Sequence, residues 1–256
     1  MKKRQLNLIL FLCLISLTIN ASNMLAAKGK QILAADQKRF YSTRNMLWLS
    51  ATLASGAVLA NTKVDGEFQR WYQSEMRSTR SDDFAAIVKP FGDGKTMVPI
   101  YLGAFAMRYL LPESKIVQPI STWAATSLRT ILVGAPPLLF LQVGVGGSRP
   151  TENDSHWRPF NDNNGVSGHA FMGATPFLAG ATVVKSPWLK SGFYAASTLT
   201  AWSRINDDKH YLSQAMMGWF IALIASKNIL NDGESRIAFT PQIQPGRTCI
   251  AFIVMF

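Results

Sequence analysis

The chain contains three histidines, His156, His169 and His210, and two of them stand in phrases that could carry out chemistry. One phrase is Val-Ser-Gly-His at residues 166–169. The other is Ser-Arg at 203–204, followed by five residues and His210. Histidine acts as nucleophile, general acid or general base near neutral pH without a large pKa shift. Each of the two histidines has an arginine nearby in sequence, which indicates phosphoryl chemistry.

Phosphoryl transfer explains the residue types around these histidines. The transferred group carries charge on its equatorial oxygens, so it calls for planar, permanently charged donors, and Arg149 and Arg204 fit that role. Backbone N–H groups at Ser167 and Gly168, where a helix is expected to begin, would add hydrogen bonds to an anion. Glycine lets the backbone approach that anion closely.

In order and spacing these phrases resemble the signature of the type 2 phosphatidic acid phosphatase family, whose fold is shared with vanadium haloperoxidases. That signature is a lysine, six residues and Arg-Pro; then Pro-Ser-Gly-His; then Ser-Arg, five residues, histidine, three residues and aspartate. The motif resemblance covers about residues 140–215. It implies an all-α bundle of about six core helices, needing no cofactor and no metal. His210 would be the nucleophile that forms a phosphohistidine, and His169 the general acid. The residues implied in binding phosphate are Gln142, Arg149, Ser167, Gly168 and Arg204.

The chain departs from the signature at three positions. Gln142 stands at the lysine position and Val166 at the proline position. Gln214 replaces the aspartate, where its amide oxygen can fix the tautomer of the nucleophile but stabilises a cation less than a carboxylate does. Asp207 and Asp208 precede the same helix, and we interpret them as N-caps rather than as replacements for that carboxylate.

Two further loop residues offer an alternative first motif. Arg158-Pro159 is a second Arg-Pro, but it lies close to the Ser-Gly-His phrase and places Thr151 at the lysine position, so the pattern favours Arg149. His156 is interpreted as an exposed loop residue. A metal centre is not expected, because no cysteine or carboxylate cluster completes a ligand set around the other two histidines.

Residues 1–27 resemble an export signal or an N-terminal anchor. A basic start, Met1-Lys2-Lys3-Arg4, precedes an apolar run at 6–19 and then small residues. We therefore expect a chain exported to a bacterial cell envelope, lying in the inner membrane with its site facing the periplasm, or in the periplasm itself. The predicted division is residues 1–27 as signal or anchor, 28–233 as the phosphatase domain and 234–256 as a C-terminal hairpin or tail.

Apolar segments of helical character follow the signal. They lie at 46–60, 97–111, 116–133, 136–145, 170–184, 192–202 and 211–229, and an amphipathic stretch at 67–86 is expected to form one surface helix. Most are shorter than the roughly 20 residues that span a bilayer core. The tail at 237–243 and 248–256 has β-prone runs separated by a turn signal and predicts a short hairpin.

The composition of the chain limits the classes of partner that it could bind. The formal net charge is +11, but no basic stripe or recognition motif supports nucleic-acid binding. With 48% hydrophobic residues, the chain more plausibly directs this charge toward a membrane and an anionic or lipid-linked phosphate substrate. The expected function is hydrolysis of a phosphate monoester or diphosphate. The alternatives are a non-catalytic lipid- or anion-binding envelope protein and a lipid phosphotransferase; the oligomeric state stays open.

Overall fold

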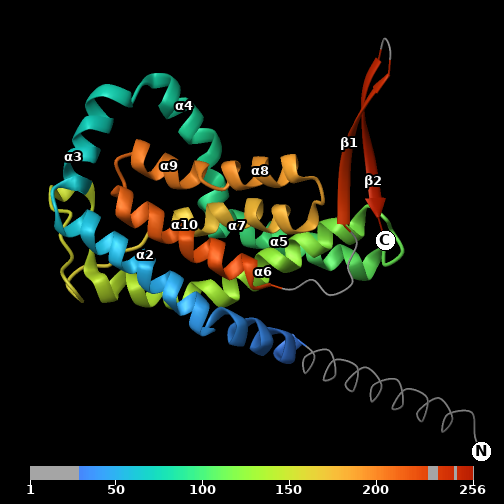
Figure 1. Cartoon of the computed structure of the whole chain (residues 1–256), viewed down its shortest axis with the longest axis horizontal. Coiled ribbons are helices and arrows are strands. Elements are labelled where there is room, and N and C mark those ends of the chain that lie inside the picture. Colours follow the sequence, from blue (N-terminus) through green and yellow to red (C-terminus); the bar gives the residue numbers. More distant parts are fainter. Residues whose placement is uncertain (1–28, 230–235, 245–246, 256) are drawn as a thin grey trace, which may run out of the picture.

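The computed structural model describes residues 29–229 and the backbone of two strands at 236–244 and 247–255. Within this part the chain folds as a helical bundle, which confirms the predicted all-α class (Figure 1). A helix that reaches residue 40 precedes the others. The remaining α-helices are α2 (Thr43–Asn61), α3 (Val64–Trp71), α4 (Thr79–Val88), α5 (Gly94–Leu110), α6 (Val117–Leu141), α7 (Gly168–Val183), α8 (Pro187–Ala196), α9 (Leu199–Asn206) and α10 (Leu212–Lys227). The predicted signal at 1–27 lies outside the described residues.

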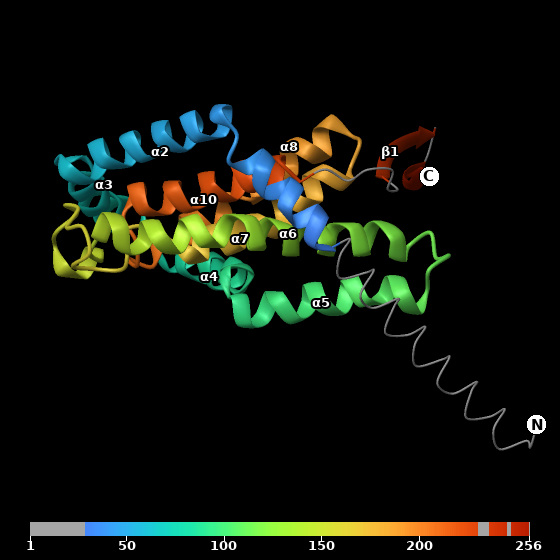
Figure 2. The ribbon, with the colours of Figure 1, turned by 90° about the horizontal axis from the view of Figure 1, so that it is seen from below.

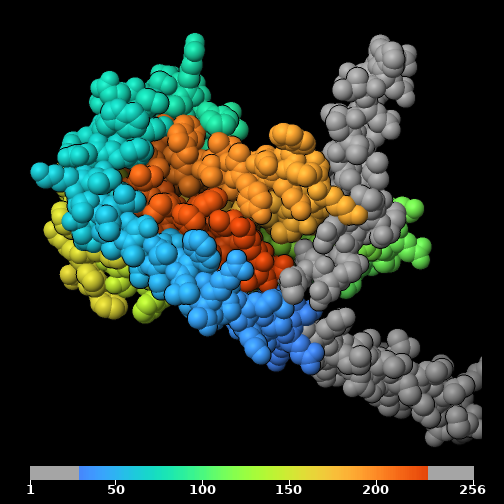
Figure 3. All heavy atoms as spheres, viewed as in Figure 1, coloured from blue at the N-terminus to red at the C-terminus, as the bar shows by residue number. Residues whose placement is uncertain are grey.

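Helices α6, α7 and α10 form the centre of the bundle. Their shared core contains Phe171 and Leu178 of α7, Met217 and Ile221 of α10, and Leu138 of α6, all almost fully buried. Figure 2 shows α2, α10 and α6 side by side, with α5 on the far side of α6. In the space-filling view α2 covers one flank of α10 (Figure 3). These helices therefore bury their apolar faces mainly against one another.

Helix α6 joins two apolar segments that the sequence separates. It continues through Pro136 and Pro137, although each proline removes one helical N–H donor. Continuous packing against α7 and α10 holds this part of the chain helical. Including the turns that follow, Val117–Glu152 is the one segment among the described residues long and apolar enough to cross a membrane. One such helix is weak support for a membrane span, since a core helix of a soluble protein meets the same criterion.

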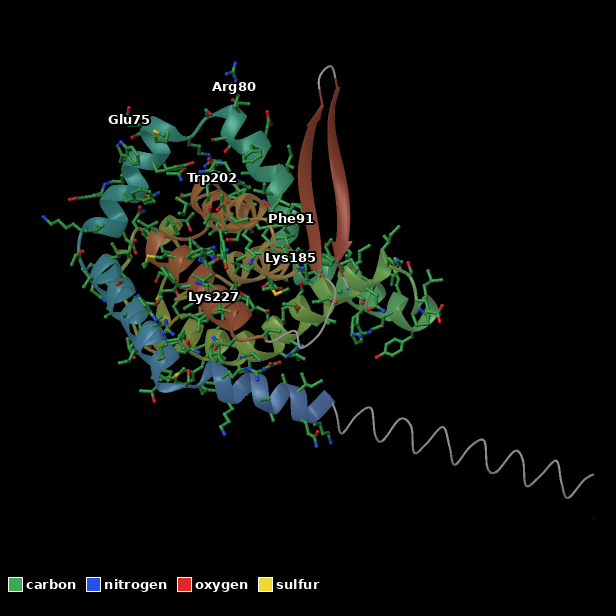
Figure 4. All side chains as sticks on the ribbon, turned by 45° about the vertical axis from the view of Figure 1, so that its right-hand side comes forward. Glu75, Arg80, Phe91, Lys185, Trp202 and Lys227 are labelled. Carbon is green, nitrogen blue, oxygen red and sulfur yellow. The ribbon has the colours of Figure 1, made fainter. Side chains whose placement is uncertain are left out.

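The amphipathic stretch at 67–86 is two helices, not the single helix predicted. A π-helical turn, Tyr72–Met76, follows α3, and the chain then leaves the helical conformation before Ser78 starts α4 as its N-cap. The Ser78 hydroxyl accepts from the Ser81 N–H, which stabilises a new helix start at this point. The Trp202 indole of α9 donates to the Tyr72 hydroxyl at 2.7 Å, which ties the turn after α3 to α9. Trp202 is labelled in Figure 4.

Two short helical turns connect these helices at the end of the bundle that carries the histidines. One is the 3₁₀ turn η2 (Lys89–Gly92) between α4 and α5, and the other is the π turn η3 (Gln142–Gly146) that continues α6. A further 3₁₀ turn, η4 (Pro150–Glu152), lies in the loop before α7. At the other end of the chain, β1 (Arg236–Gln244) and β2 (Arg247–Met255) pair antiparallel. Their side chains lie outside the described residues.

Candidate active site

The first turns of α7 and α10 lie against each other and bring the two histidine phrases together. The Ser167 N–H donates to the carbonyl oxygen of Gln214 at 3.0 Å, which ties the start of α7 to α10. A Cβ at Gly218 would stand 2.3 Å from the Ser167 carbonyl oxygen, so only glycine permits this approach. Ser167 also caps α7 by accepting from the Ala170 N–H. The Ser-Gly-His phrase is thus a helix start, as predicted.

A tight turn between α9 and α10 sets the distance between Arg204 and His210. The Arg204 carbonyl oxygen accepts from the N–H groups of both Lys209 and His210, at 2.9 and 3.2 Å. Closing the turn requires Asp208 to adopt a left-handed conformation with φ 54°, which aspartate tolerates better than most residues. The five-residue spacing in the sequence is therefore the length of this turn.

His210 is buried, and its neighbour Gln214 decides which ring nitrogen carries the proton. Gln214 Nε2 lies 2.7 Å from the Ser148 carbonyl oxygen, which can only accept. The side-chain oxygen Oε1 therefore faces the other way, where it accepts from the Tyr211 N–H at 3.2 Å and meets His210 Nδ1 at 2.9 Å. Since Oε1 can only accept, Nδ1 must carry the hydrogen. The free lone pair of neutral His210 is then on Nε2.

The surroundings of His210 keep it neutral at physiological pH. Burial lowers its pKa to about 4, and the positive charges of Arg204 and Arg149 act in the same direction against the opposing hydrogen bond to Gln214. An imidazole that is unprotonated near pH 7 can act as a nucleophile without first losing a proton.

His169 occupies the first turn of α7 and is more exposed. Its pKa is lowered by partial desolvation and by the positive charge of Arg204, while the carboxylate of Asp93 raises it. An exposed ring can exchange its proton with water, and an incoming phosphate dianion would raise its pKa again. These properties suit a group that gives and takes a proton.

Arg204 presents a buried, unsatisfied donor. The residue is 7% exposed, and its Nε has no hydrogen-bond partner among the described residues. Its Nη1 lies 3.4 Å from Asp207 Oδ2, which leaves most of the guanidinium fork unused. A buried guanidinium N–H without a partner is costly in a folded protein, and an anion bound beside it would remove that cost.

Arg149 and Gln142 flank the same region from the loop before α7. Arg149 is exposed, donates through Nε to Asn164 Oδ1 at 3.2 Å, and its charge lowers the pKa of both histidines. Gln142 Nε2 donates to the Val166 carbonyl oxygen at 2.9 Å. At the position of the family's lysine, this chain therefore has an amide that holds the turn before Ser167.

Arg158 and His156, the two other loop residues considered for the site, both contact Asp154. Asp154 pairs with Arg158, and it also meets His156 Nδ1 at 2.9 Å. Both partners are exposed, and neither contributes to the pKa shifts of the other two histidines. The arrangement favours Arg149 over Arg158 as the arginine of the site.

The interpretation of Asp207 and Asp208 as N-caps is wrong. Tyr211 is the N-cap of α10, and Asp208 instead accepts from Gln69 at 2.8 Å. Asp207 lies at the C-terminal end of α9, where Lys89 reaches it. The turn after Arg204 consumes these two residues, so they stand too early in the chain to cap the next helix.

Sequence reasoning missed three residues near the site, because they come from helices distant in the chain. Lys89 and Asp93 belong to η2 and the start of α5, and both act on the charge of His169. Asp65 of α3 is fully buried and accepts from the Ser213 N–H at 3.0 Å, which caps α10 from outside. The Gly92-Asp93-Gly94 turn was the only local signal at any of them. The described residues contain no group of three histidines, cysteines or carboxylates able to hold a metal ion.

The fold and the site together define a class of protein: a helical bundle with two histidines and two arginines gathered at its helix ends. Comparison with known families agrees, since residues 140–233 match the model of the PAP2 superfamily. The match confirms the resemblance carried by the motifs, and the chain is consistent with a PAP2 superfamily member, a family associated with phosphatase chemistry. No curated protein and no solved structure matches the chain.

Proposed function

We propose that the protein is a phosphatase that hydrolyses a phosphate monoester or diphosphate through a phosphohistidine at His210. The observation that carries this proposal is the pairing of two unusual groups. Neutral His210 has its lone pair on Nε2, and the buried Nε of Arg204 has no hydrogen-bond partner within the described part of the chain. One group is suited to attack phosphorus, and the other to bind the oxygens of the same phosphoryl group.

The reaction would proceed in two steps with balanced proton transfers. His210 Nε2 forms a bond to phosphorus while the bond from phosphorus to the leaving oxygen breaks, and His169 gives its proton to that oxygen. Water then attacks phosphorus and passes a proton to His169. The P–N bond breaks, its electron pair returns to Nε2, and inorganic phosphate leaves.

Positioning and charge neutralisation supply the catalysis in this scheme. Arg204 and Arg149 would bind the equatorial oxygens, and the Gly168 N–H at the start of α7 would add a donor. The Ser167 N–H is not available for this role, because it donates to the Gln214 carbonyl oxygen at 3.0 Å. Gln214 keeps the hydrogen on His210 Nδ1 but carries no negative charge to offset the cation that forms on attack. We therefore expect a slower first step than a carboxylate at this position would allow.

A lipid-linked phosphate is the proposed substrate class. Large apolar side chains are exposed along α5 and α6, among them Leu110 at 78%, Ile116 at 71% and Phe140 at 67%. Only 28% of the most apolar window of the long α6 segment is buried within the protein. Exposed apolar side chains of this kind occur where a protein contacts a membrane or another protein. This supports association of the protein with a membrane.

The decisive experiment compares the purified full-length protein with its His210→Ala variant. Phosphate release is measured from phosphatidate, a polyprenyl diphosphate and a chromogenic phosphate ester, and acid-labile phosphohistidine is trapped by rapid quenching. We expect turnover and trapping in the wild type only. Equal turnover by the two proteins would refute His210 as nucleophile.

The same assay distinguishes the alternatives. Gln142 and Gln214 stand where the family has charged residues, which favours a non-catalytic anion-binding protein as the second candidate. That candidate requires phosphate binding without any turnover. Accumulation of a new phosphorylated lipid in place of inorganic phosphate would identify a phosphotransferase.

A further inference from the structure

The site lacks the lysine that its family signature places before Arg-Pro, yet a lysine reaches the site from another part of the chain. Lys89 Nζ lies 3.1 Å from Asp207 Oδ2, and Arg204 Nη1 lies 3.4 Å from the same oxygen. The ammonium and the guanidinium are therefore no farther apart than these two distances together. Lys89 stands beside the buried arginine of the candidate phosphate site.

The backbone of η2 holds Lys89 in this place. A Cβ at Gly92 would lie 2.8 Å from the His169 carbonyl oxygen and 2.8 Å from Thr200 Cγ2, so η2 packs directly on α7 and α9. In a 3₁₀-helix residues three apart share a face, which places Lys89 on the side of Gly92 that meets His169. Phe91, labelled in Figure 4, packs against Phe177 of α7 with ring centroids 5.2 Å apart.

Lys89 and Arg204 have one carboxylate between them at this contact, while the carboxylate of Asp93 acts on His169. Asp207 is shared between Lys89 and Arg204, and one carboxylate cannot neutralise two cations. The effect of Lys89 already extends to His169, whose pKa its charge helps to lower. The Lys89 side chain is 50% exposed, so its ammonium group is accessible to an anion from solvent.

We propose that Lys89 supplies the phosphate-binding positive charge that this chain lacks at position 142. A phosphate held by the free Nε of Arg204 would draw the ammonium group of Lys89 to its remaining oxygens, in competition with Asp207. Gln142 then keeps only the structural task of holding the Val166 carbonyl. This inference rests on the proposed function, because it assigns a binding role within the same site.

The test measures binding of inorganic phosphate to the full-length protein by calorimetry at low and high ionic strength. Lys89→Gln is expected to weaken binding about three- to tenfold at low salt, as for the loss of one partly screened charge near an anion. Lys95→Gln is the matched control: it removes the same charge from the exposed start of the neighbouring α5 and should bind phosphate as the wild type does.

Three further variants separate a charge effect from a structural one. Lys89→Arg should keep most of the affinity, and Gln142→Lys introduced into the Lys89→Gln protein should restore it by returning the charge to the family's position. Asp207→Asn should tighten binding, since it removes the competing carboxylate. The proposal would be overturned if Lys89→Gln lost affinity and neither Lys89→Arg nor the added Gln142→Lys restored it. Wild-type affinity in Lys89→Gln, or absence of phosphate binding in the wild type, would also overturn it.

Phosphate binding is measured without turnover, so this test and the test of the proposed function can fail separately. A wild type that binds phosphate through Lys89 but neither turns over substrate nor forms phosphohistidine would refute the proposed function and leave this inference standing. Full phosphatase activity of the wild type, together with unchanged phosphate binding in Lys89→Gln, would support the proposed function and refute this inference.

Discussion

Gln214 is the residue whose replacement tests the site most directly. Its side chain makes three contacts at once: it donates to the Ser148 carbonyl, and it accepts from the Tyr211 N–H and from His210 Nδ1. Gln214→Leu keeps a similar volume and removes all three. At about 1–2 kcal/mol for each of the three buried groups left unsatisfied, we expect the free energy of unfolding to fall by about 3–6 kcal/mol.

The effect on catalysis should exceed what this loss of stability explains. Without an acceptor at Nδ1, His210 can move its hydrogen to Nε2 and lose the lone pair that attacks phosphorus. We expect kcat to fall about 10²- to 10⁴-fold under conditions in which the variant is folded. Denaturant unfolding and single-turnover formation of phosphohistidine measure the two effects. Gln37→Leu, at an exposed position of the helix that precedes α2, should change neither.

A second variant keeps the reasoning testable if Gln214→Leu does not fold. Gln214→Glu preserves the shape, and its neutral carboxyl can donate to the Ser148 carbonyl as the amide does. When that carboxyl ionises it stabilises the imidazolium, so the pKa of His210 should rise above its value of about 4 in the wild type. Titration of the ring followed by NMR measures this shift. An unchanged His210 pKa, or a Gln214→Leu enzyme with wild-type kcat, would refute the assigned contact.

The remaining predictions concern pH and the support of α10. Attack requires neutral His210 and proton donation requires charged His169. The value of kcat/KM should therefore rise through about pH 4 and fall at a pH below 6.5, the ordinary histidine pKa, which gives an acidic optimum. His169→Gln should abolish the decrease on the alkaline side, and a neutral optimum would contradict these roles. As pH falls from 6.5 to about 4, the unfolded state binds a proton at His210 that the folded state refuses, so chemical denaturation should show about 3 kcal/mol of stability lost over this window, a component absent from His210→Gln. Asp65→Ala should lower the free energy of unfolding by about 1–3 kcal/mol because the Ser213 N–H loses its buried acceptor, whereas Asp83→Ala, at an exposed position of α4, should leave it unchanged.

Local patterns predicted the parts of the fold that depend on local chemistry. Ser167 and Gly168 precede an apolar run and start α7, as a capping residue before a helix should. The same approach failed where tertiary packing dominated. Packing against α7 and α10 carries α6 through Pro136 and Pro137, and the Ser78 cap divides a stretch whose amphipathic pattern is continuous.

The candidate site, too, has features that the sequence predicted and features that depend on tertiary packing. The sequence by itself determined the types and spacing of the groups that could do the chemistry, since His169, Arg204 and His210 lie in short phrases whose backbone geometry is local. Only the tertiary structure decided their protonation and surroundings. Burial sets the pKa of His210, and the Ser148 carbonyl orients the Gln214 amide and so fixes the tautomer. Packing of η2 on α7 brings Lys89 to Asp207 across more than a hundred residues of chain, a contact that no local pattern encodes.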